Sequence, residues 1–229
     1  AHEIKNPLNA IVIYLELLRK ELEKDHLKKD NIMEKLNVVE EEIERLSDMA
    51  TEFLSYSNAA PLETSPIDVR ILLEQVVRFL GYQAKKQTVV IEKDFSVSVQ
   101  EISANHKQLK QAFINIILNA LQVMPDGGEL KVSVDEIPDQ AGWVRISFAD
   151  DGPGIPAEVQ DHVFEPFYTT REEGTGLGLA FVEKVVREHG GKLILKSEEK
   201  VGTVVTIDLP AGGASLGPVS LGQRNSVNY

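Results

Sequence analysis

Two glycine-rich stretches carry the strongest chemical signal in this sequence. The first reads DDGPGIP from Asp150 and follows a predicted strand, and the second reads GTGLGL from Gly174 and opens a predicted helix. Glycine lets the backbone approach a ligand closely, and a loop that runs into a helix N-terminus presents free N–H groups to a phosphate. At a strand end, the Asp150 carboxylate can accept a hydrogen bond from an exocyclic amine such as that of adenine. Either stretch alone is weak evidence, because ordinary turns are also glycine-rich, but together they predict a nucleotide site.

Two common phosphate-binding motifs are absent from these stretches. A Walker P-loop requires Gly-Lys-Ser/Thr, which follows neither stretch. A Rossmann fingerprint requires a Gly-x-x-Gly spacing, whereas Gly174, Gly176 and Gly178 alternate with other residues and lie late in the chain. The predicted site therefore belongs to another class of nucleotide-binding fold.

Two asparagines add a third element to this site. Asn115 and Asn119 lie four residues apart in a predicted helix over 109–124, so they share one face of it. Buried amides need partners, and neutral oxygen ligands suit Mg²⁺, which also binds phosphate oxygens. Alternatively, both amides make purely structural hydrogen bonds. The glycine-rich stretches downstream favour the metal and phosphate interpretation.

A histidine and a glutamate near the N-terminus could also take part in chemistry. A neutral imidazole nitrogen of His2 can attack a phosphoryl group, and Glu3 can accept the proton or fix the tautomer. Alone, this pair means little, and it is not a zinc-protease motif because Asn6 replaces the second histidine. We expect the remaining histidines to lie at the surface. They are His26, His106, His162 and His189.

Composition excludes several classes of protein. The 229 residues carry a formal net charge of −12, which argues against direct nucleic-acid binding because that needs a basic surface. There is no cysteine, which excludes disulfides and thiolate metal sites. No apolar run approaches the roughly 20 residues that span a bilayer, so we expect no membrane contact within these residues and a cytoplasmic location. The chain begins inside a predicted helix, so we expect it to be part of a longer protein that could be membrane-anchored.

Residues 1–58 are predicted to form two long helices. Their apolar residues recur at alternating steps of four and three, which is a heptad seam, and the polar stretch 25–31 joins them. An antiparallel hairpin with one seam per helix closes its core best when two copies form a four-helix bundle. The alternative is a monomeric hairpin docked on its own second domain. Proline and small residues predict a linker over 59–66.

Helices and strands alternate over residues 67–210. Because they follow no regular βαβ repeat, we expect an α+β fold with a two-layer sandwich. The tail 211–229 is rich in glycine and serine and is predicted to be disordered. The expected helices span 69–86, 109–124 and 177–189, and the expected strands span 88–95, 129–137, 143–149, 192–197 and 203–209.

Five motifs in order resemble those of two-component sensor histidine kinases. They read HEIKNPL from His2, NIILNA from Asn115, DDGPG from Asp150, FEPFYTT from Phe164 and GTGLGL from Gly174, and the resemblance covers residues 1 to about 210. The Asn-Pro after the histidine and the short segment 169–171 are similar to the nitrogen-regulation type. The resemblance implies a dimerisation and histidine-phosphotransfer hairpin over 1–58. It implies an ATP-binding domain over 67–210 with the fold shared by gyrase, Hsp90 and histidine kinases.

The resemblance also implies roles for particular residues. Asp150 binds adenine, and Asn119 with Asn115 carries Mg²⁺ and phosphates. Residues 157–173 form a mobile lid, in which Arg171 meets the γ-phosphate or is simply a solvated charge. The residues expected to contact ATP are Asn115, Asn119, Asp150, Gly152, Gly154, Phe164, Phe167, Thr170, Arg171, Gly174, Thr175, Gly176, Leu177 and Gly178.

The implied function is a kinase core that binds Mg-ATP, phosphorylates His2 and passes the phosphoryl group to an aspartate of a response-regulator receiver domain. The amide of Asn6 can orient a water against that phosphoaspartate, which implies phosphatase activity as well. One rival is an ATPase related to gyrase or Hsp90, which carries a glutamate where this chain has Asn115, a poor base. Another rival is a non-catalytic dimerisation scaffold.

Overall fold

The computed structural model describes residues 2–23, 28–57, 62–138, 140–171 and 174–212. These residues fall into two compact units. One unit comprises the N-terminal helices together with residues 167–177, and the other comprises residues 62–166 and 178–212.

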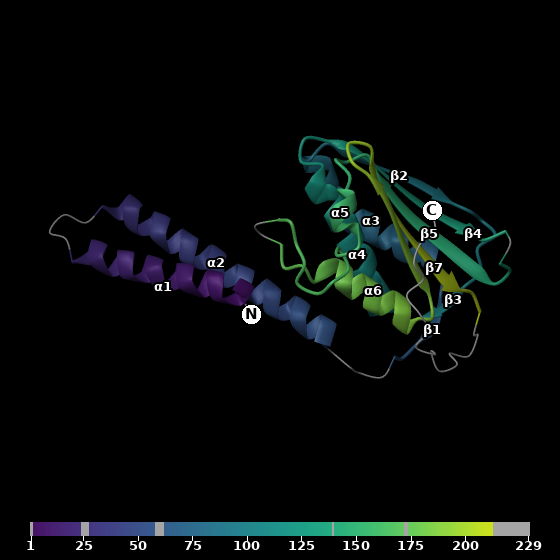
Figure 1. Cartoon of the computed structure of the whole chain (residues 1–229), viewed down its shortest axis with the longest axis horizontal. Coiled ribbons are helices and arrows are strands. Elements are labelled where there is room, and N and C mark those ends of the chain that lie inside the picture. The colour runs from purple at the N-terminus through teal and green to yellow at the C-terminus, as the bar shows by residue number, and fades with distance from the viewer. Residues whose placement is uncertain (1, 24–27, 58–61, 139, 172–173, 213–229) are drawn as a thin grey trace. The chain divides into compact units, whose positions relative to one another are not determined.

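The N-terminal helices form the predicted hairpin. Helix α1 runs from His2 to Leu22 and helix α2 from Lys29 to Ser57, side by side in Figure 1. Arg19 and Lys20 lie in the last turn of α1, where positive charge stabilises a helix C-terminus. The connection at residues 24–27 lies outside the described residues.

Much of the apolar seam of this hairpin is exposed. Val39 and Met49 are its buried apolar side chains among the described residues, apart from Pro7. Five predicted seam positions are about half exposed in the single chain: Leu8, Leu15, Leu22, Ile43 and Phe53. A surface of this kind normally packs against another apolar surface.

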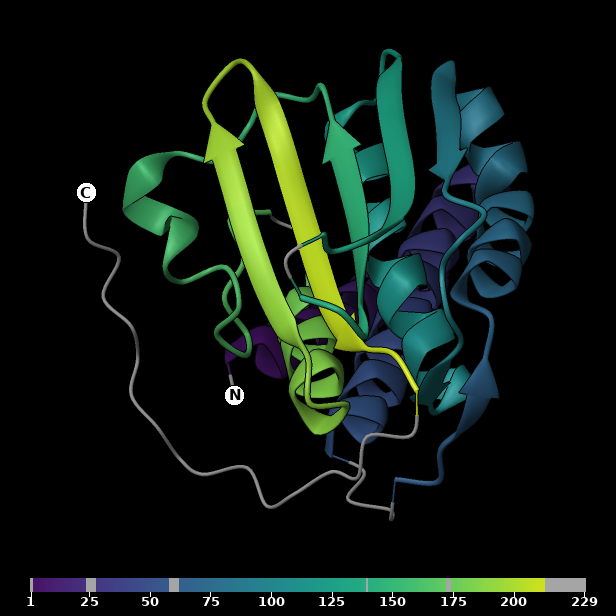
Figure 2. The ribbon, with the colours of Figure 1, turned by 90° about the vertical axis from the view of Figure 1, so that its right-hand side faces the viewer.

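The second unit is the predicted α+β sandwich. Its five-stranded sheet has the order β2-β4-β5-β7-β6, in which β2 and β4 are parallel and the other neighbours antiparallel. Three helices lie on the same side of the sheet (Figures 1 and 2). The strands are β2 (Val89–Phe95), β4 (Gly128–Glu136), β5 (Trp143–Asp150), β6 (Lys192–Glu198) and β7 (Gly202–Pro210), and the helices are α3 (Val69–Lys86), α4 (His106–Val123) and α6 (Gly178–Glu188).

The core lies between the helices and the sheet. Alternate residues of the central strands point to the helices and are fully buried, while their neighbours are more exposed, which is the period-2 pattern of a sheet covered on one face. Phe113 of α4 packs against Phe148 of β5 with ring centroids 5.7 Å apart. This contact fixes α4, which carries two candidate site residues, against the strand that ends at a third.

Side-chain caps set the starts of α3 and α4. The Asp68 carboxylate accepts a hydrogen bond from the Arg70 N–H at 3.0 Å. Asn105 accepts one from the Gln108 N–H at 3.1 Å, so α4 begins at His106, three residues earlier than its apolar pattern predicts.

Three short elements differ from the prediction. Strand β1 (Ser65–Ile67) pairs antiparallel with β3 (Ile102–Ala104), and α5 (Ala157–Gln160) is a single turn. The predicted linker 59–66 therefore overlaps β1, and its residues 59–61 lie outside the described residues. Its Pro66 is tolerated because β1 is an edge strand.

The predicted disordered tail 211–229 is wrong for its first two residues. The Ala211 N–H donates to the Gly142 carbonyl at 2.7 Å, and the Gly212 N–H donates to the Glu101 carbonyl at 2.9 Å. Residues 213–229 lie outside the described residues.

The prediction of a surface position is also wrong for His189. His189 is 2% exposed, because it directly follows α6 and continues the helical spacing of Val182 and Val185, which lie on the core face. Its Nδ1 hydrogen bonds to the Val185 carbonyl at 2.7 Å, which leaves Nε2 to accept the Asn105 N–H at 2.9 Å. Burial lowers the pKa of His189. His106 and His162 are exposed as predicted, and His26 lies outside the described residues.

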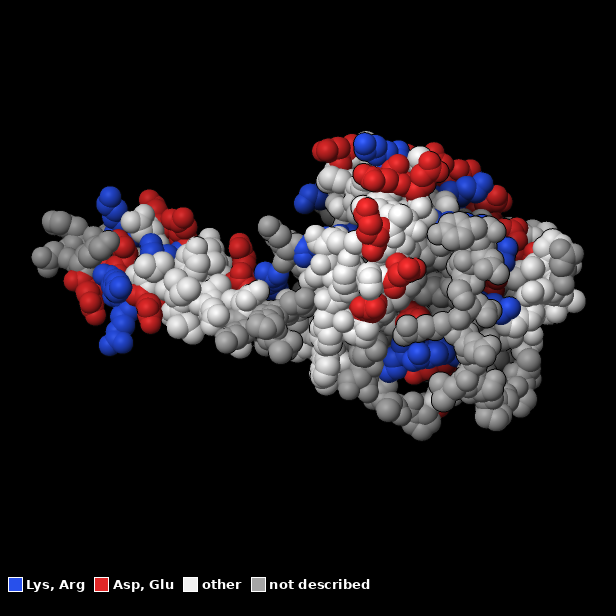
Figure 3. Space-filling model, in the orientation of Figure 1, with Lys and Arg blue, Asp and Glu red and all other residues white. Residues whose placement is uncertain are grey.

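The described surface carries charges of both signs. On the face shown in Figure 3, acidic and basic side chains are interspersed. Within the described ranges, none of the helices combines the length and apolar character needed to cross a bilayer.

Candidate functional site

The two asparagines of α4 lie one turn apart and are half-buried. Asn115 accepts a hydrogen bond from Gln111 Nε2 at 2.9 Å and donates its own Nδ2 to the Gly178 carbonyl at 3.1 Å. Asn115 therefore joins α4 to the first residue of α6. This is the structural hydrogen bonding that the sequence left open as an alternative.

Gly178 lies beside both amides. A Cβ added there would come within 3.8 Å of Asn115 Nδ2 and 3.9 Å of Asn119 Nδ2. The first N–H groups of a helix have no partner within the helix, and they favour anions. The glycine thus leaves a space bounded by two side-chain amides and the start of α6.

The two amide nitrogens beside this space can donate hydrogen bonds to phosphate oxygens, and the amide oxygens of the same side chains are the groups that would suit Mg²⁺. Mg²⁺ keeps several waters and takes one or two protein oxygens together with phosphate oxygens. Among the residues with described positions, no three or more histidine, aspartate or glutamate side chains gather where they could hold a metal. A cation at this place would therefore take an amide oxygen, phosphate oxygens and water as its ligands.

Asp150 ends strand β5. Its Oδ1 accepts a hydrogen bond from the Gly152 N–H at 3.1 Å, and the Thr203 N–H also bonds to its carboxylate. Burial raises the pKa of Asp150 above the usual value of 3.8, while these two N–H groups act in the opposite direction. A half-buried carboxylate at a strand end is the group expected for recognition of the adenine amine.

The loop after Asp150 is closely packed at its two glycines. A Cβ on Gly152 would lie 2.9 Å from Asp150 Oδ1 and 3.0 Å from a methyl carbon of Val123. Gly154 has φ 70°, and a Cβ there would lie 2.1 Å from the Glu198 carbonyl oxygen. Only glycine fits at position 154, because a side chain would both strain the backbone and collide with β6.

Residues 167–177 include the start of the second glycine-rich stretch, which begins at Gly174. The Phe167 N–H donates to the Gly176 carbonyl at 2.9 Å, which closes this segment at its ends. Phe167 and Gly176 both have positive φ, 69° and 66°. The Leu177 N–H donates to Thr175 Oγ1 at 3.3 Å. Residues 172–173 lie outside the described residues.

The remaining predicted ATP contacts differ in exposure. Phe164 and Gly174 are half-buried, Thr170 is exposed and Leu177 is buried. Arg171 is half-buried, and burial lowers the pKa of its guanidinium, which nevertheless stays charged in proteins.

The candidate phosphoryl acceptor and its helpers lie on α1. His2 and Glu3 begin the helix, but their side chains lie outside the described residues. Asn6 is exposed one turn later, and Pro7 is buried inside the helix. The roles of all these residues stay predictions.

Sequence reasoning missed three residues around Asp150. Thr203 is buried and supplies the second N–H to Asp150. Ser197 and Gln160 bond to the loop that follows Asp150. The only signal in the sequence was the pair of hydroxyl residues, Ser197 and Thr203, on either side of the predicted turn of a hairpin.

Comparison with known families gives two matches along the chain. Residues 104–213 match the model described as histidine kinase-, DNA gyrase B- and HSP90-like ATPase. Residues 1–61 match the model of the His Kinase A phospho-acceptor domain.

Two curated relatives resemble most of the chain. Sporulation kinase E of Bacillus subtilis strain 168 is 36% identical over 210 residues, which is 92% of this chain and 27% of that protein. The sensory histidine kinase/phosphatase NtrB of Rhodobacter capsulatus is 30% identical over 226 residues, which is 94% of this chain and 61% of that protein. The chain thus spans between about a quarter and three fifths of their lengths. Because a sporulation kinase is at least as similar as NtrB, the nitrogen-regulation type is supported only loosely.

Two solved structures share the architecture. Histidine kinase ThkA in complex with response regulator TrrA is 27% identical, with a TM-score of 0.74 over 93% of this chain and 60% of that one. Full-length ShkA in complex with AMPPNP is 27% identical, with a TM-score of 0.69 over 91% of this chain and 44% of that one. The two matched domains, the ordered motifs and these likenesses agree. This chain belongs to the sensor histidine kinases and comprises their phosphoacceptor and ATPase domains.

Proposed function

We propose that this chain binds Mg-ATP, transfers the γ-phosphoryl group to His2 and then passes it to an aspartate of a response regulator. The observation that carries the proposal is the position of Gly178 beside the amides of Asn115 and Asn119 at the start of α6. The presence of AMPPNP in the ShkA structure supports a triphosphate as the ligand.

The ends of the nucleotide have different partners in this proposal. The Asp150 carboxylate accepts a hydrogen bond from the adenine amine. Gly152 and Gly154 let the backbone approach the base. The start of α6 donates N–H groups to the phosphates, and Asn119 contributes an amide oxygen to Mg²⁺. The ion, when bound, neutralises charge on the transferred group and orients it. Arg171 would add a cation near the γ-phosphate.

The transfer itself is an in-line displacement. A ring nitrogen of His2 forms a bond to the γ-phosphorus, the bond from that phosphorus to the bridging oxygen breaks, and ADP leaves. Glu3 takes the proton that the imidazole loses. In the second transfer, an aspartate oxygen of the partner protein forms a bond to the phosphorus, and the bond between the phosphorus and the histidine nitrogen breaks.

A reverse activity belongs to the same proposal. Asn6 lies one helical turn after His2 and is exposed, so its amide can orient a water against a phosphoaspartate. The relative NtrB of Rhodobacter capsulatus is named as both a kinase and a phosphatase. If Asn6→Ala leaves dephosphorylation of the cognate regulator unchanged, Asn6 does not have this role.

The proposed partners are a second copy of the chain and a receiver domain. The half-exposed seam of α1 and α2 supports a dimer through residues 1–58, because pairing two hairpins would bury that seam. The complex of ThkA with TrrA supports a response regulator as the second partner. We propose a cytoplasmic location for this catalytic part.

A labelling experiment separates this function from its rivals. The chain is incubated with γ-labelled ATP and Mg²⁺, with His2→Gln as the variant and His106→Gln as the matched control at an exposed histidine. The proposal expects acid-labile, base-stable label on the wild type and the control and none on His2→Gln. Release of free phosphate without protein label would indicate an ATPase, and failure to bind nucleotide would indicate a scaffold.

A further inference from the structure

Ser197 lies at the end of β6, next to the loop of residues 150–156. Its Oγ accepts a hydrogen bond from the Ile155 N–H at 2.8 Å and lies 2.9 Å from the Gly202 carbonyl oxygen, to which it donates. It also lies 2.9 Å from Thr203 Oγ1. Since the single Ser197 proton goes to Gly202, the Thr203 hydroxyl donates to Ser197. One hydroxyl thus uses all of its hydrogen-bonding capacity to join the loop to the β6–β7 turn.

Gln160 makes a second connection between the same two parts. Its Nε2 donates to the Ile155 carbonyl at 2.7 Å and to the Ser197 carbonyl at 3.0 Å. Gln160 is the last residue of α5, the helical turn that begins the predicted lid. A single amide therefore bonds the loop, the lid base and β6 together.

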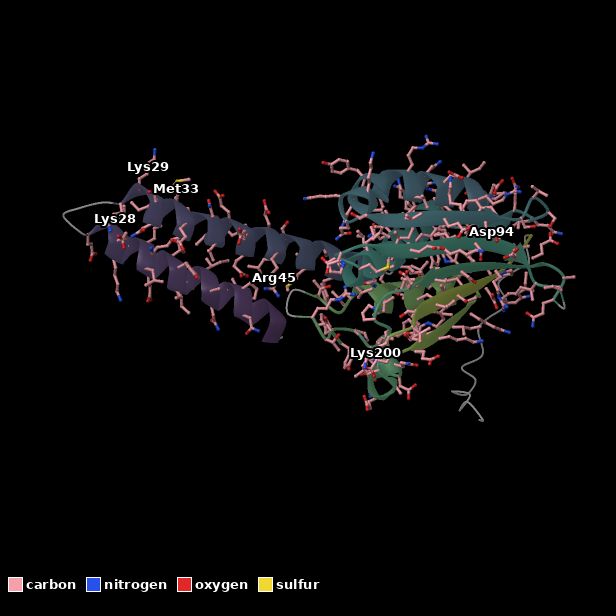
Figure 4. The ribbon with its side chains drawn as sticks, turned by 90° about the horizontal axis from the view of Figure 1, so that it is seen from above. Lys28, Lys29, Met33, Arg45, Asp94 and Lys200 are labelled. Atoms are coloured by element: carbon pink, nitrogen blue, oxygen red, sulfur yellow. The ribbon has the colours of Figure 1, made fainter. Side chains whose placement is uncertain are left out.

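The backbone packs closely around these side chains. Lys200, which is labelled in Figure 4, lies in the turn between β6 and β7. Its N–H donates to the Pro153 carbonyl at 2.7 Å. A Cβ on Gly202 would lie 2.1 Å from the Asp150 carbonyl oxygen. The turn between β6 and β7 thus contacts the loop at Lys200, and the first residue of β7, Gly202, packs against Asp150.

The network reaches the predicted adenine-binding carboxylate through Thr203. The hydroxyl of Thr203 bonds to Ser197, and its N–H bonds to the Asp150 carboxylate. The hairpin turn therefore shares hydrogen bonds both with Asp150 and with the residues that hold the loop.

We propose that Ser197 and Gln160 are positioning residues of the nucleotide site, which fix the loop of residues 150–156 in its adenine-binding arrangement before ATP arrives. This inference rests on the proposed ATP site and adds the residues that preorganise it. Neither side chain needs to touch the nucleotide.

The expected effect follows from the population of the competent loop. Without the Ser197 hydroxyl, the Ile155 N–H and the Thr203 hydroxyl lose their partner, so other loop arrangements become populated. Apparent affinity falls in proportion to the competent fraction. If that fraction drops to about one tenth, the Kd for ATP rises about tenfold.

The test measures ATP and ADP binding by titration calorimetry for the full chain, Ser197→Ala, Ser197→Thr and Gln160→Ala. Ser147→Ala is the matched control, because Ser147 pairs with Thr206 through hydroxyls 3.3 Å apart on neighbouring strands of the same sheet. We expect Ser197→Ala to lower the affinity by about tenfold and Gln160→Ala to lower it by at least about threefold. In each variant the loss should be the same for ATP and for ADP. Ser197→Thr, which keeps the hydroxyl, should bind both nucleotides with wild-type affinity. Ser147→Ala should do the same.

Autophosphorylation kinetics add a readout that a general loss of stability would not give. The KM for ATP should rise in Ser197→Ala and Gln160→Ala, while kcat at saturating ATP stays within twofold, because the groups at the phosphate end are unchanged. Wild-type affinity in both variants would overturn the inference. The inference would also be overturned if Ser197→Ala and Ser197→Thr lost affinity alike while Gln160→Ala bound with wild-type affinity. A wild-type chain that binds no nucleotide would instead overturn the proposed function, on which the inference rests.

Discussion

Replacing Gly178 by alanine adds a methyl group beside both amides of α4 and leaves the fold intact. The nearest atoms to the new Cβ would be those of Asn115 and Asn119, at 3.8 to 3.9 Å, which is ordinary van der Waals contact. Gly178 is not among the glycines with positive φ. Alanine is also a better helix former than glycine, although the gain at the first residue of a helix is smaller than in its interior. The variant should therefore fold at least as stably as the wild type.

ATP binding should nevertheless fall, because the methyl group occupies the space proposed for a phosphate oxygen and the hydrated ion. A hydrogen bond to a charged group contributes about 1.5–3 kcal/mol. Since each 1.4 kcal/mol is about tenfold in affinity, losing one such bond raises the Kd for ATP about tenfold to a hundredfold. The contrast between unchanged stability and weakened binding identifies a ligand contact.

Gly81→Ala provides the matched control for this substitution. Gly81 lies inside α3, and a Cβ there would meet nothing within 4 Å. The control should gain stability and keep wild-type affinity. Titration calorimetry with Mg-ATP and thermal unfolding measure both quantities. If Gly178→Ala binds Mg-ATP as tightly as Gly81→Ala, the phosphate site does not lie beside these amides.

Three further predictions concern the groups around the site. Gly154→Ala should destabilise the fold by about 1–3 kcal/mol, because it places a side chain at φ 70° against the Glu198 carbonyl, and unchanged urea unfolding would contradict this. Because burial lowers the pKa of His189, the unfolded chain binds its proton first as pH falls below about 6.5, so stability should decrease from there toward the lower pKa of the folded state. In urea unfolding, the stability of His189→Gln should fall less steeply with decreasing pH than that of the wild type. An equal slope would show that His189 is not the cause of the pH dependence. Because burial raises the pKa of Asp150, ATP affinity should fall on acidification at a higher pH than for an ordinary aspartate, and titrations of Asp150→Asn should show weak binding without this limb.

The long elements were predictable because their patterns repeat over many residues. The heptad steps predict α1 and α2, and the helical spacing of apolar residues predicts α3 with the bounds that it has, 69–86. Strands β1 and β3 were missed because three residues cannot display a two-residue period. Their pairing depends on residues 35 or more positions apart, which no local pattern encodes.

His189 shows a signal that was present but not used. Continuing the stripe of Val182 and Val185 by one turn, just past the end of α6, places this histidine on the side that faces the core. The need for a partner inside the protein follows from that position, but the identity of the partner, the N–H of Asn105, comes only from the tertiary structure.

The candidate site was predictable as a set of residue types, and its internal contacts were not. Spacing placed Asn115 and Asn119 on one face, but the bond from Asn115 to Gly178 joins two helices that are distant in sequence. The same limit applies to Ser197, whose hydroxyl reaches Ile155 only because β6 lies beside the loop that follows β5. Motifs therefore indicate which residues bind the ligand, and packing determines which residues position them.

The central claim is that the γ-phosphoryl group of ATP moves to His2, and mapping the phosphorylated residue tests it most directly. The chain is incubated with Mg-ATP, kept at neutral or basic pH and analysed by mass spectrometry with fragmentation that preserves phosphohistidine. We expect modification at His2 in the wild type, its loss in Gly178→Ala at limiting ATP, and its retention in Gly81→Ala. Phosphate on a different residue, or an unmodified His2 in a chain that binds Mg-ATP, would contradict the account.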